Sequence, residues 1–531
     1  MRALSILLSP VAGGTALHPI DEEMNRRTFF KTGALGGFGL IAAQSDALSS
    51  LDVSTNPFTL GVASGDPTPG GVVLWTRLAP DPLAGGGMPP LPILVRWRVA
   101  EDHELQHVVQ QGMAVAWPSL AHSVHVEVEG LAADRWYFYQ FTVGDAESPV
   151  GRTRTLPPFG AHVDRLRFAF VSCQDWQNGL YPAYRNLAQE DLDLVVHLGD
   201  YIYEYASDPT AVRQHNGAEA RTLQGYRNRY ALYKTDPHLQ AAHLACPWLV
   251  VPDDHEVENN YANFISEDND DPGAFLLRRA AAYRAYYEHM PLRARSFPVG
   301  ASMWLYRGLD FGDLASFSAL DTRQYRTDQP CGDGPRLPCA AEFDPAQTMT
   351  GPEQEAWLLS RLNRSRSRWN VVAQQTMFAS FDFLSGPNAV FLMDQWDGYV
   401  AARQRITSFI ALRQPSNPVV ITGDIHSSWV HDLKASFLNP ASPTVGTEFV
   451  GPSISSDFPP VLIPLTEAAL PANPHTIFFD GLYHGYVRCT LTPEQWIADY
   501  RVVPTILDAQ AEAFTLRSFV VRDGEPGAIL A

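Results

Sequence analysis

Beyond residue 165 the chain alternates short, continuous apolar runs with longer segments of helical periodicity, and this alternation limits the folds it can adopt. Continuous apolar runs of this length are typical of strands that are buried on both faces. We expect strands at 166–171, 192–198, 248–251, 311–317, 369–373 and 418–422. We expect helices at 181–189, 223–233, 272–289, 352–364 and 397–413. The sequence therefore predicts a layered α/β domain with a mainly buried sheet over residues 165–525.

The preceding residues, 57–157, follow a different pattern, in which apolar and polar side chains alternate with a period of two. The alternation is clear over 93–99 and 123–129, and turn signals separate such segments. This pattern favours antiparallel strands with one buried face. We therefore expect a small all-β domain of the immunoglobulin or fibronectin kind before the α/β domain. Tyr137, which follows Leu131, has the spacing of a tyrosine corner.

Two further features are expected in the α/β domain. Its tail shows strand patterns at 486–491 and 496–502, followed by a helical pattern over 507–514. Earlier, Thr350 and Glu353 have the spacing of a capping box at the start of the 352–364 helix.

Length and charge limit the class of protein. The chain has 531 residues, enough for about two to three domains, and a formal net charge of −19. Because the phosphate backbone of a nucleic acid requires a basic surface, this charge argues against a stable nucleic-acid partner. No apolar run reaches the roughly 18 residues that a membrane span needs, so we expect none.

The cysteines divide into three groups. Cys331 and Cys339 bracket a turn-rich loop, and an oxidising compartment would allow a disulfide between them. Cys246 and Cys489 lie among apolar residues and are expected to be buried thiols. Cys173 follows a predicted strand and is considered below.

Residues 1–47 have the features of an export signal. The stretch Asn-Arg-Arg-Thr-Phe-Phe-Lys at 25–31 resembles the twin-arginine motif, and a mildly apolar segment rich in Gly and Ala follows it. Met24 directly precedes this stretch, so we interpret residues 1–23 as an over-extended start. The alternative is an amphipathic first helix. A twin-arginine signal implies export of the folded protein by the twin-arginine machinery, and a periplasmic or secreted location.

Several predicted strands end in side chains that bind metals. The residues that follow the strands are Cys173, Asp200, Asp254, Asp424 and, as a neutral oxygen donor, Gln375. A single ending of this kind is most simply a turn. Strand ends at one edge of one sheet, however, bring their side chains together. Since converging carboxylates without a partner repel one another, we expect a cation cluster at this edge.

Three motifs in chain order are Gly-Asp-x-x-Tyr at 199–203, Asp-Asp-His-Glu at 253–256 and Gly-Asp-x-His at 423–426. Together they resemble the pattern of calcineurin-like metallophosphoesterases and, within that superfamily, of PhoD-like alkaline phosphatases. The resemblance extends to Gly-Val-Ala-Ser-Gly-Asp-Pro at 61–67, Trp-Thr-Arg-Leu at 75–78, Leu-Asp-Thr-Arg-Gln-Tyr-Arg at 320–326 and Trp-Asp-Gly-Tyr at 396–399. It therefore covers nearly the whole mature chain, and it implies a layered metallophosphoesterase sandwich.

The resemblance also implies a ferric ion beside one or two calcium ions. In such enzymes a cysteine, a shared aspartate, a tyrosine and a late histidine hold the iron, and the matching positions here are Cys173, Asp200, Tyr203 and His426. The calcium ions share the aspartate and use the positions of Asp254 and Asp424. Carboxylates at these two positions suit a hard, oxygen-seeking ion and argue against a di-zinc centre.

Three further polar residues are expected to contact substrate or to act as outer-sphere groups: Gln375, Arg323 and Asn260. Gln375 stands where the superfamily often has a ligand histidine. Arg323 either pairs with a local acid or holds a phosphate oxygen. Taken alone, Cys173 is more simply explained as a buried thiol, but its place after a strand, at the family's ligand position, reverses that interpretation. His197 is interpreted as structural.

The resemblance implies an exported alkaline phosphatase, a phosphomonoesterase with phosphodiesterase activity on small-molecule phosphoesters. A metal-bound hydroxide would attack phosphorus in line. His255 would protonate the leaving alkoxide or brace the phosphate. Two alternatives stay open: a phospholipase D-like phosphodiesterase that uses the same site, and a non-catalytic, calcium-binding secreted protein.

Overall fold

The computed structural model describes residues 56–384, 386–439 and 441–531. The predicted export signal at 1–47 lies outside the described residues. Within those described ranges, no helix combines the length and the apolar character that crossing a membrane requires.

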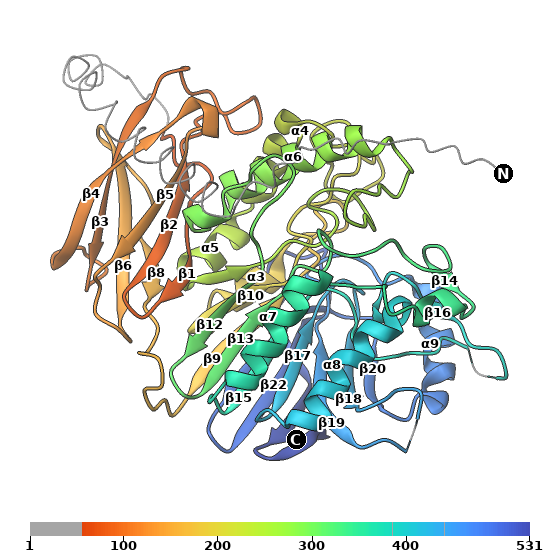
Figure 1. Cartoon of the computed structure of the whole chain (residues 1–531). Coiled ribbons are helices and arrows are strands. Elements are labelled where there is room, and N and C mark those ends of the chain that lie inside the picture. Colours follow the sequence, from red (N-terminus) through yellow and green to blue (C-terminus); the bar gives the residue numbers. More distant parts are fainter. Residues whose placement is uncertain (1–55, 385, 440) are drawn as a thin grey trace, which may run out of the picture. The chain divides into compact units, whose positions relative to one another are not determined.

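A long mixed sheet forms one layer of the α/β part and continues into the N-terminal part (Figure 1). Strands β9, β10 and β11 run parallel at its centre, and β21 pairs antiparallel with β9. In spatial order its strands are β24 (Glu525–Leu530), β23 (Phe514–Arg522), β22 (Gln495–Val503), β21 (His484–Leu491), β9 (Leu166–Val171), β10 (Leu194–His197), β11 (Trp248–Val250), β1 (Val62–Thr68), β2 (Gly71–Arg77) and β5 (Ser123–Glu129).

A second mixed sheet forms the other β layer, with β13, β15, β17 and β19 parallel to one another. Its spatial order is β12 (Arg307–Phe311), β13 (Ala315–Ala319), β15 (Trp369–Ala373), β17 (Pro418–Thr422), β19 (Thr444–Val450), β18 (Ser428–Lys434) and β20 (Thr476–Asp480). A separate short pair joins β14 (Pro335–Arg336) to β16 (Phe391–Leu392).

Helices cover the outer faces of the two sheets. The α-helices are α3 (Pro182–Leu187), α4 (Leu223–Lys234), α5 (Pro237–Ala245), α6 (Pro272–His289), α7 (Gly351–Arg364), α8 (Val400–Arg413) and α9 (Ile463–Ala469). Short 3-10 helices are η1 (Pro118–Leu120), η2 (Ala294–Ser296), η3 (Ala340–Phe343), η4 (Trp396–Tyr399), η5 (Pro460–Leu462) and η6 (Leu470–Ala472). Helices α3–α6 pack on the first sheet, whereas α7 and α8 pack on the second.

The central core lies between the two sheets. Phe168 and Val196 of the first sheet pack in one cluster with Phe317, Val371 and Ile421 of the second. The rings of Phe168 and Phe317 meet edge to face, with centroids 5.2 Å apart. Because helices cover the opposite faces, the central strands are buried on both sides, which explains their continuous apolar sequences.

The predicted strands divide between two stacked sheets, whereas the strand patterns alone indicate one mainly buried sheet. The division begins at the predicted strand 311–317, which is a hairpin of β12 and β13. Gly312 makes the turn with φ of +58°, a conformation that favours glycine. When both strands of a hairpin are buried, the apolar sequence continues from one to the other, so it does not reveal the turn between them.

Three local expectations also differ from the structure. No helix forms over 507–514, because the Asp508 carboxylate accepts a hydrogen bond from the Gln510 amide (2.9 Å) and closes a turn before β23. Thr350 makes no side-chain cap; instead the Thr348 hydroxyl accepts from the Gly351 amide at 2.9 Å. Helices α5 and α9 form where none was expected.

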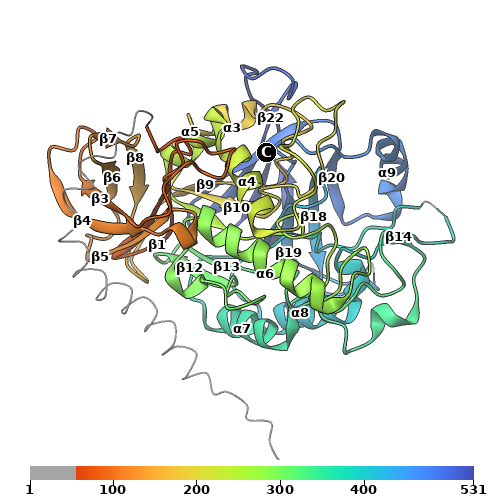
Figure 2. The ribbon, with the colours of Figure 1, turned by 90° about the horizontal axis from the view of Figure 1, so that it is seen from above.

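The N-terminal all-β part is confirmed, with strands gathered as Figure 2 shows. Its outer sheet contains β4 (Val108–Ala116), β3 (Ile93–Ala100), β6 (Trp136–Val143), β7 (Ala146–Glu147) and β8 (Gly151–Arg154). The tyrosine corner is present, since the Tyr137 hydroxyl accepts from the Ala132 amide at 3.1 Å. Strand β1 meets β11 at the pair Gly65–Trp248, so the opposing sheet is continuous with the α/β part.

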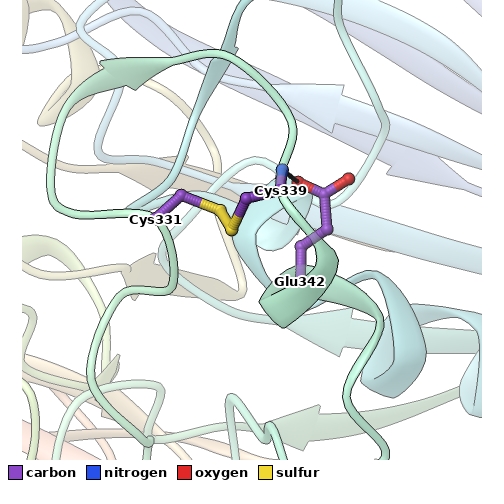
Figure 3. The surroundings of a disulfide bond; sticks show 3 residues. All are labelled: Cys331, Cys339 and Glu342. Atoms are coloured by element: carbon purple, nitrogen blue, oxygen red, sulfur yellow. Dashed lines mark hydrogen bonds between the residues drawn. A yellow bond between two sulfur atoms is a disulfide. The ribbon is translucent and has the colours of Figure 1, made fainter.

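The expected cysteine states are also found. Cys331 and Cys339 form a disulfide, and the Cys339 amide donates to the Glu342 carboxylate at 3.3 Å (Figure 3). Cys246 and Cys489 are buried free thiols, and Cys173 is a third.

We predict that Gly65→Ala destabilises the protein by about 1–3 kcal/mol, because a methyl group there would lie 2.7 Å from the carbonyl oxygens of Pro291 and Trp248. Gly70→Ala is the matched control, since the nearest atom to its added methyl group is 4.0 Å away. Urea unfolding of the two variants measures the difference. Equal stability of the two would contradict the tight approach of β1 to β11.

Candidate metal centre

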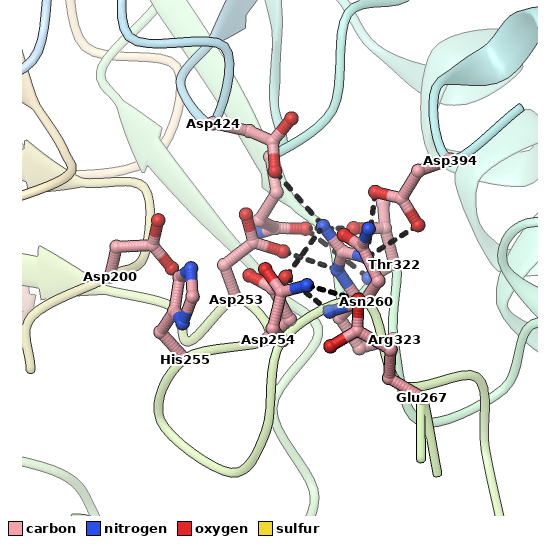
Figure 4. Close-up of polar contacts among 12 residues, drawn as sticks. Asp200, Asp253, Asp254, His255, Asn260, Glu267, Thr322, Arg323, Asp394 and Asp424 are labelled. Carbon is pink, nitrogen blue, oxygen red and sulfur yellow. Dashed lines mark hydrogen bonds and ion pairs between the residues drawn. The ribbon is translucent and has the colours of Figure 1, made fainter. Parts of the chain in front are cut away.

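The carboxyl ends of strands from both sheets meet at one place (Figure 4). Cys173, Asp200 and Asp254 follow β9, β10 and β11 of the first sheet, while Asp424 and His426 follow β17 of the second. Together with Asp253 and His255, these residues form three overlapping groups, and within each group the donor atoms lie within 4.8 Å of one another. The structure thus brings together all the residues that the sequence assigned to metal binding, but from two sheets.

The backbone at these strand ends is strained. Cys173, Asp200, Asp424 and His426 have φ values of 58°, 57°, 63° and 58°, in the left-handed region that residues with a Cβ rarely adopt. Such conformations cost about 1–3 kcal/mol each and persist only where the surrounding structure holds them. Here the flanking strands are buried on both sides, which fixes the direction of each loop.

Glu256 ties two of the loops together. Its carboxylate accepts hydrogen bonds from the backbone amides of Asp200 (3.1 Å), Tyr201 (2.7 Å) and Asp253 (2.8 Å). Burial, and then the nearby charge of Asp200, raise the pKa of Glu256 to about 8. The last residue of the Asp-Asp-His-Glu motif is therefore an internal link between the ends of β10 and β11.

The first donor group combines sulfur, nitrogen and oxygen. It consists of Cys173, Asp200 and His426. The Tyr203 hydroxyl lies beside them, 3.0 Å from Asp200 Oδ2 and 3.1 Å from His426 Nε2. The Ser456 hydroxyl donates to the same Tyr203 oxygen at 2.7 Å and so fixes its position.

The second donor group consists only of carboxylates, from Asp253, Asp254 and Asp424. Arg323, which is 1% exposed, lies among them: its Nε is 2.5 Å from Asp253 and its Nη2 is 3.0 Å from Asp424. Burial raises the pKa of Asp424 to about 6 although Arg323 opposes this shift. For Asp254, burial acts in the same direction, but Arg323 and His255 outweigh it and hold its pKa below the usual value.

Unpartnered oxygens show that these groups suit cations. Asp200 Oδ1, Asp253 Oδ2 and Asp254 Oδ1 are buried and have no hydrogen-bond partner among the described residues. A buried carboxylate oxygen without a partner is costly, and a metal ion would remove that cost. The mixed donor group suits a transition metal and the carboxylate group suits a hard ion such as calcium.

His255 lies at the edge of the centre and is held by Glu204. Its Nδ1 is 2.8 Å from Glu204 Oε2, and its ring packs on Tyr203 with centroids 4.1 Å apart. Burial opposes protonation, but the charges of Glu204 and then Asp254 outweigh it, so the pKa of His255 is well above its usual value. His255 also groups with Asp200 and Asp254, so one of its ring nitrogens lies within reach of both carboxylates.

Two of the residues expected at substrate have other partners. The Gln375 side chain is fully buried; its oxygen accepts from the Thr322 hydroxyl (2.6 Å) and its nitrogen donates to the Leu320 carbonyl (3.0 Å). Its geometry therefore does not support a phosphate contact, because both ends of the amide hold the segment that carries Arg323. For Arg323 the structure favours pairing with local acids.

The remaining two residues singled out from the sequence are Asn260 and His197. The Asn260 amide donates to Asp254 Oδ2 at 2.7 Å, while its side chain donates to Asp333 at 2.8 Å. His197 is 1% exposed, stacks on Trp248, and accepts from the Gly199 amide, in agreement with a structural role.

Four residues that the sequence left without a role support the centre: Asp253, Glu204, Asp394 and Gln395. Asp394 contacts Arg323 through both oxygens at 2.9 Å, and Gln395 Nε2 donates to Asp424 at 2.5 Å. The sequence offered one clue to these four residues, because each lies within two positions of a residue or motif already singled out. No local pattern, however, links Asp394 to an arginine 71 residues away.

Comparison with known proteins identifies the family. A family model described as PhoD-like phosphatase matches residues 168–500, and a model of the N-terminal domain of the same family matches 43–157. The chain belongs to the PhoD-like phosphatase family. Alkaline phosphatase D of Bacillus subtilis (strain 168) is 50% identical over 528 residues, which cover 96% of this chain and 89% of that protein. The solved structure described as "Structure of PhoD" matches with a TM-score of 0.87 and 51% identity, covering 90% of this chain and 92% of that chain.

Membership of the PhoD-like phosphatase family confirms the resemblance seen in the motifs, and it makes the protein a phosphoester hydrolase. The solved relative also confirms the fold class, an α/β domain preceded by an all-β domain.

We predict that Arg323→Met lowers the free energy of unfolding by about 3–5 kcal/mol in the presence of a chelator, because it leaves several buried carboxylates without a counter-charge. Arg368→Met is the control, since Arg368 pairs with Asp523 at the surface. Chemical unfolding with EDTA present measures both. A change within about 1 kcal/mol of the control would show that Arg323 does not balance the acidic cluster.

Proposed function

We propose that this protein is an exported alkaline phosphatase that hydrolyses phosphomonoesters and, on the same site, phosphodiesters, with one ferric ion and one or two calcium ions. The observation that carries the proposal is the adjacency of two unlike donor groups, which a third group of Asp200, Asp254 and His255 joins. One offers a thiol, an imidazole and a phenol, and the other offers carboxylates with unpartnered oxygens.

Cys173, Tyr203 and His426 would hold the iron together with Asp200, and Asp254 and Asp424 would hold calcium. The Asp253 carboxylate belongs to the second group by position. When bound, such ions would lower the pKa of a bound water and neutralise the charge of a substrate phosphate. Asp200 would be shared, because it belongs to the mixed group and also to the group with Asp254 and His255 that leads to the carboxylates.

The protein's own contribution to the chemistry is orientation. Glu204 holds Nδ1 of His255, so the opposite nitrogen is directed to the centre, where it would donate a proton to the leaving alkoxide or brace the phosphate. The strained turns at Asp200 and Asp424 hold their carboxylates in fixed directions. Such preorganisation avoids rearrangement during the reaction.

Export is supported by two features. The twin-arginine stretch at 25–31 is an address for transport of folded proteins. The Cys331–Cys339 disulfide is typical of an oxidising compartment. We infer a periplasmic or secreted protein, with residues 57–157 as the all-β domain and 165–525 as the catalytic domain.

The iron assignment is tested by visible absorption spectroscopy. A phenolate bound to ferric iron absorbs visible light, so the metal-replete protein should have a charge-transfer band, and Tyr203→Phe should lose it. Tyr201→Phe is the control, because the Tyr201 hydroxyl contacts His243 at 2.8 Å. A colourless protein without iron by elemental analysis would refute this assignment.

A separate test concerns Asp200. Full activity of Asp200→Asn would refute the proposal that Asp200 is a ligand shared between the metal ions.

The role of His255 is tested by leaving-group dependence. We predict that His255→Ala slows hydrolysis of an alkyl phosphate by at least about 100-fold, but that of 2,4-dinitrophenyl phosphate much less, since only the poor leaving group needs a proton. Glu204→Gln should also slow both reactions, each by a smaller factor than His255→Ala does. Steady-state rates, measured on variants with equal metal content, give the comparison. An equal loss on both substrates would contradict proton donation by His255.

A further inference from the structure

The loop closed by the Cys331–Cys339 disulfide contacts the residues around the acidic donor group from one side. Asp333, inside this loop, accepts a hydrogen bond from the Asn260 side chain at 2.8 Å. The Asn260 backbone amide in turn donates to Asp254 Oδ2 at 2.7 Å, and Asn260 itself has a φ of +50°. Asp333 therefore helps to hold a strained residue that orients Asp254.

The same loop contacts the acidic group from a second side. The Gly334 carbonyl accepts from the Met393 amide at 3.1 Å, and β14 pairs with β16. The chain leaves β16 directly into Asp394 and Gln395, which contact Arg323 and Asp424. The segment that steadies Asp424 is thus attached to the disulfide loop by main-chain hydrogen bonds.

The loop itself is mostly exposed and contains several residues in left-handed backbone conformations. Cys331, Gly332 and Gly334 have positive φ values of 65°, 85° and 74°, and β14 contains only two residues, both exposed. Leu337 is 62% exposed, so the loop does not bury its apolar side chain. A disulfide across a short loop limits the conformations of the open state, so it restrains this loop together with the hydrogen bonds of Asp333 and Gly334.

We propose that the disulfide loop is a positioning element of the acidic metal site, with Asp333 as the positioning residue. The loop holds Asn260 on one side and β16 on the other, and so fixes the distance between Asp254 and Asp424. Opening the disulfide lowers the affinity of this site for a hard divalent cation and leaves the mixed donor group of Cys173 in place. The proposal rests on the proposed function, which assigns calcium to these carboxylates.

The opening step is a reduction. A phosphine attacks one sulfur and breaks the S–S bond; with one water it yields two cysteine thiols and the phosphine oxide, so the disulfide gains two electrons and two protons. Tris(2-carboxyethyl)phosphine supplies this chemistry and is removed before measurement. The three other cysteines are already free thiols and are unchanged.

The test is a calcium titration by calorimetry on the chelator-treated full chain. It compares the oxidised protein, the reduced protein, the double variant Cys331→Ser/Cys339→Ser, and Asp333→Ala. We expect the apparent Kd for calcium to rise about tenfold in the last three, because losing an outer-sphere partner weakens metal sites by about this factor. Asp328→Asn is the matched control: it removes one negative charge from the same segment, and the Asp328 carboxylate accepts from the neighbouring Gln329 amide.

A second readout does not depend on metal. Hydrogen exchange of peptides that cover 257–262 and 390–396 should be faster in the reduced protein and in the double variant, with exchange over 166–171 unchanged. Equal calcium affinity and equal exchange in all forms would overturn the proposal while leaving the phosphatase assignment intact. Oxidised protein that neither binds calcium nor hydrolyses phosphoesters would overturn both.

Discussion

The candidate centre depends on the burial of one guanidinium among several acids. Arg323 is 1% exposed and lies within 3.0 Å of oxygens from Asp253, Asp394 and Asp424. Buried carboxylates from two sheets would repel one another without it. One oxygen of Asp253 accepts a hydrogen bond from Arg323, while the other has no partner among the described residues. The cluster is therefore partly neutralised by Arg323 and can still bind a cation.

The strands that end at the centre fix the positions of these charged side chains. Cys173 and Asp200 leave one sheet, Asp424 and His426 leave the other, and all four turn through left-handed conformations. The core between the sheets fixes where the strands end, and Glu256 joins two of the loops through backbone amides. Strain at the loops is thus offset by packing elsewhere, a common arrangement at functional sites.

Local sequence patterns predicted much of this correctly. Buried strands require continuous apolar runs, and metal-binding side chains that recur directly after such runs indicate a shared site at the strand ends. The patterns failed where a local signal was absent. The hairpin at Gly312 lies inside an apolar run because both its strands are buried, and Gln375 sits at a strand end but turns its amide towards Thr322.

The sequence by itself determined which residue types stand at the strand ends, because apolar periodicity and motif spacing are local properties. It also determined the family, through motifs spread along nearly the whole chain. Only the tertiary structure decided that the ends belong to two sheets, that Arg323 pairs with acids, and that the loop of Asp333 braces Asn260. These contacts join residues far apart in the chain, and long-range pairing follows from packing that no local pattern records.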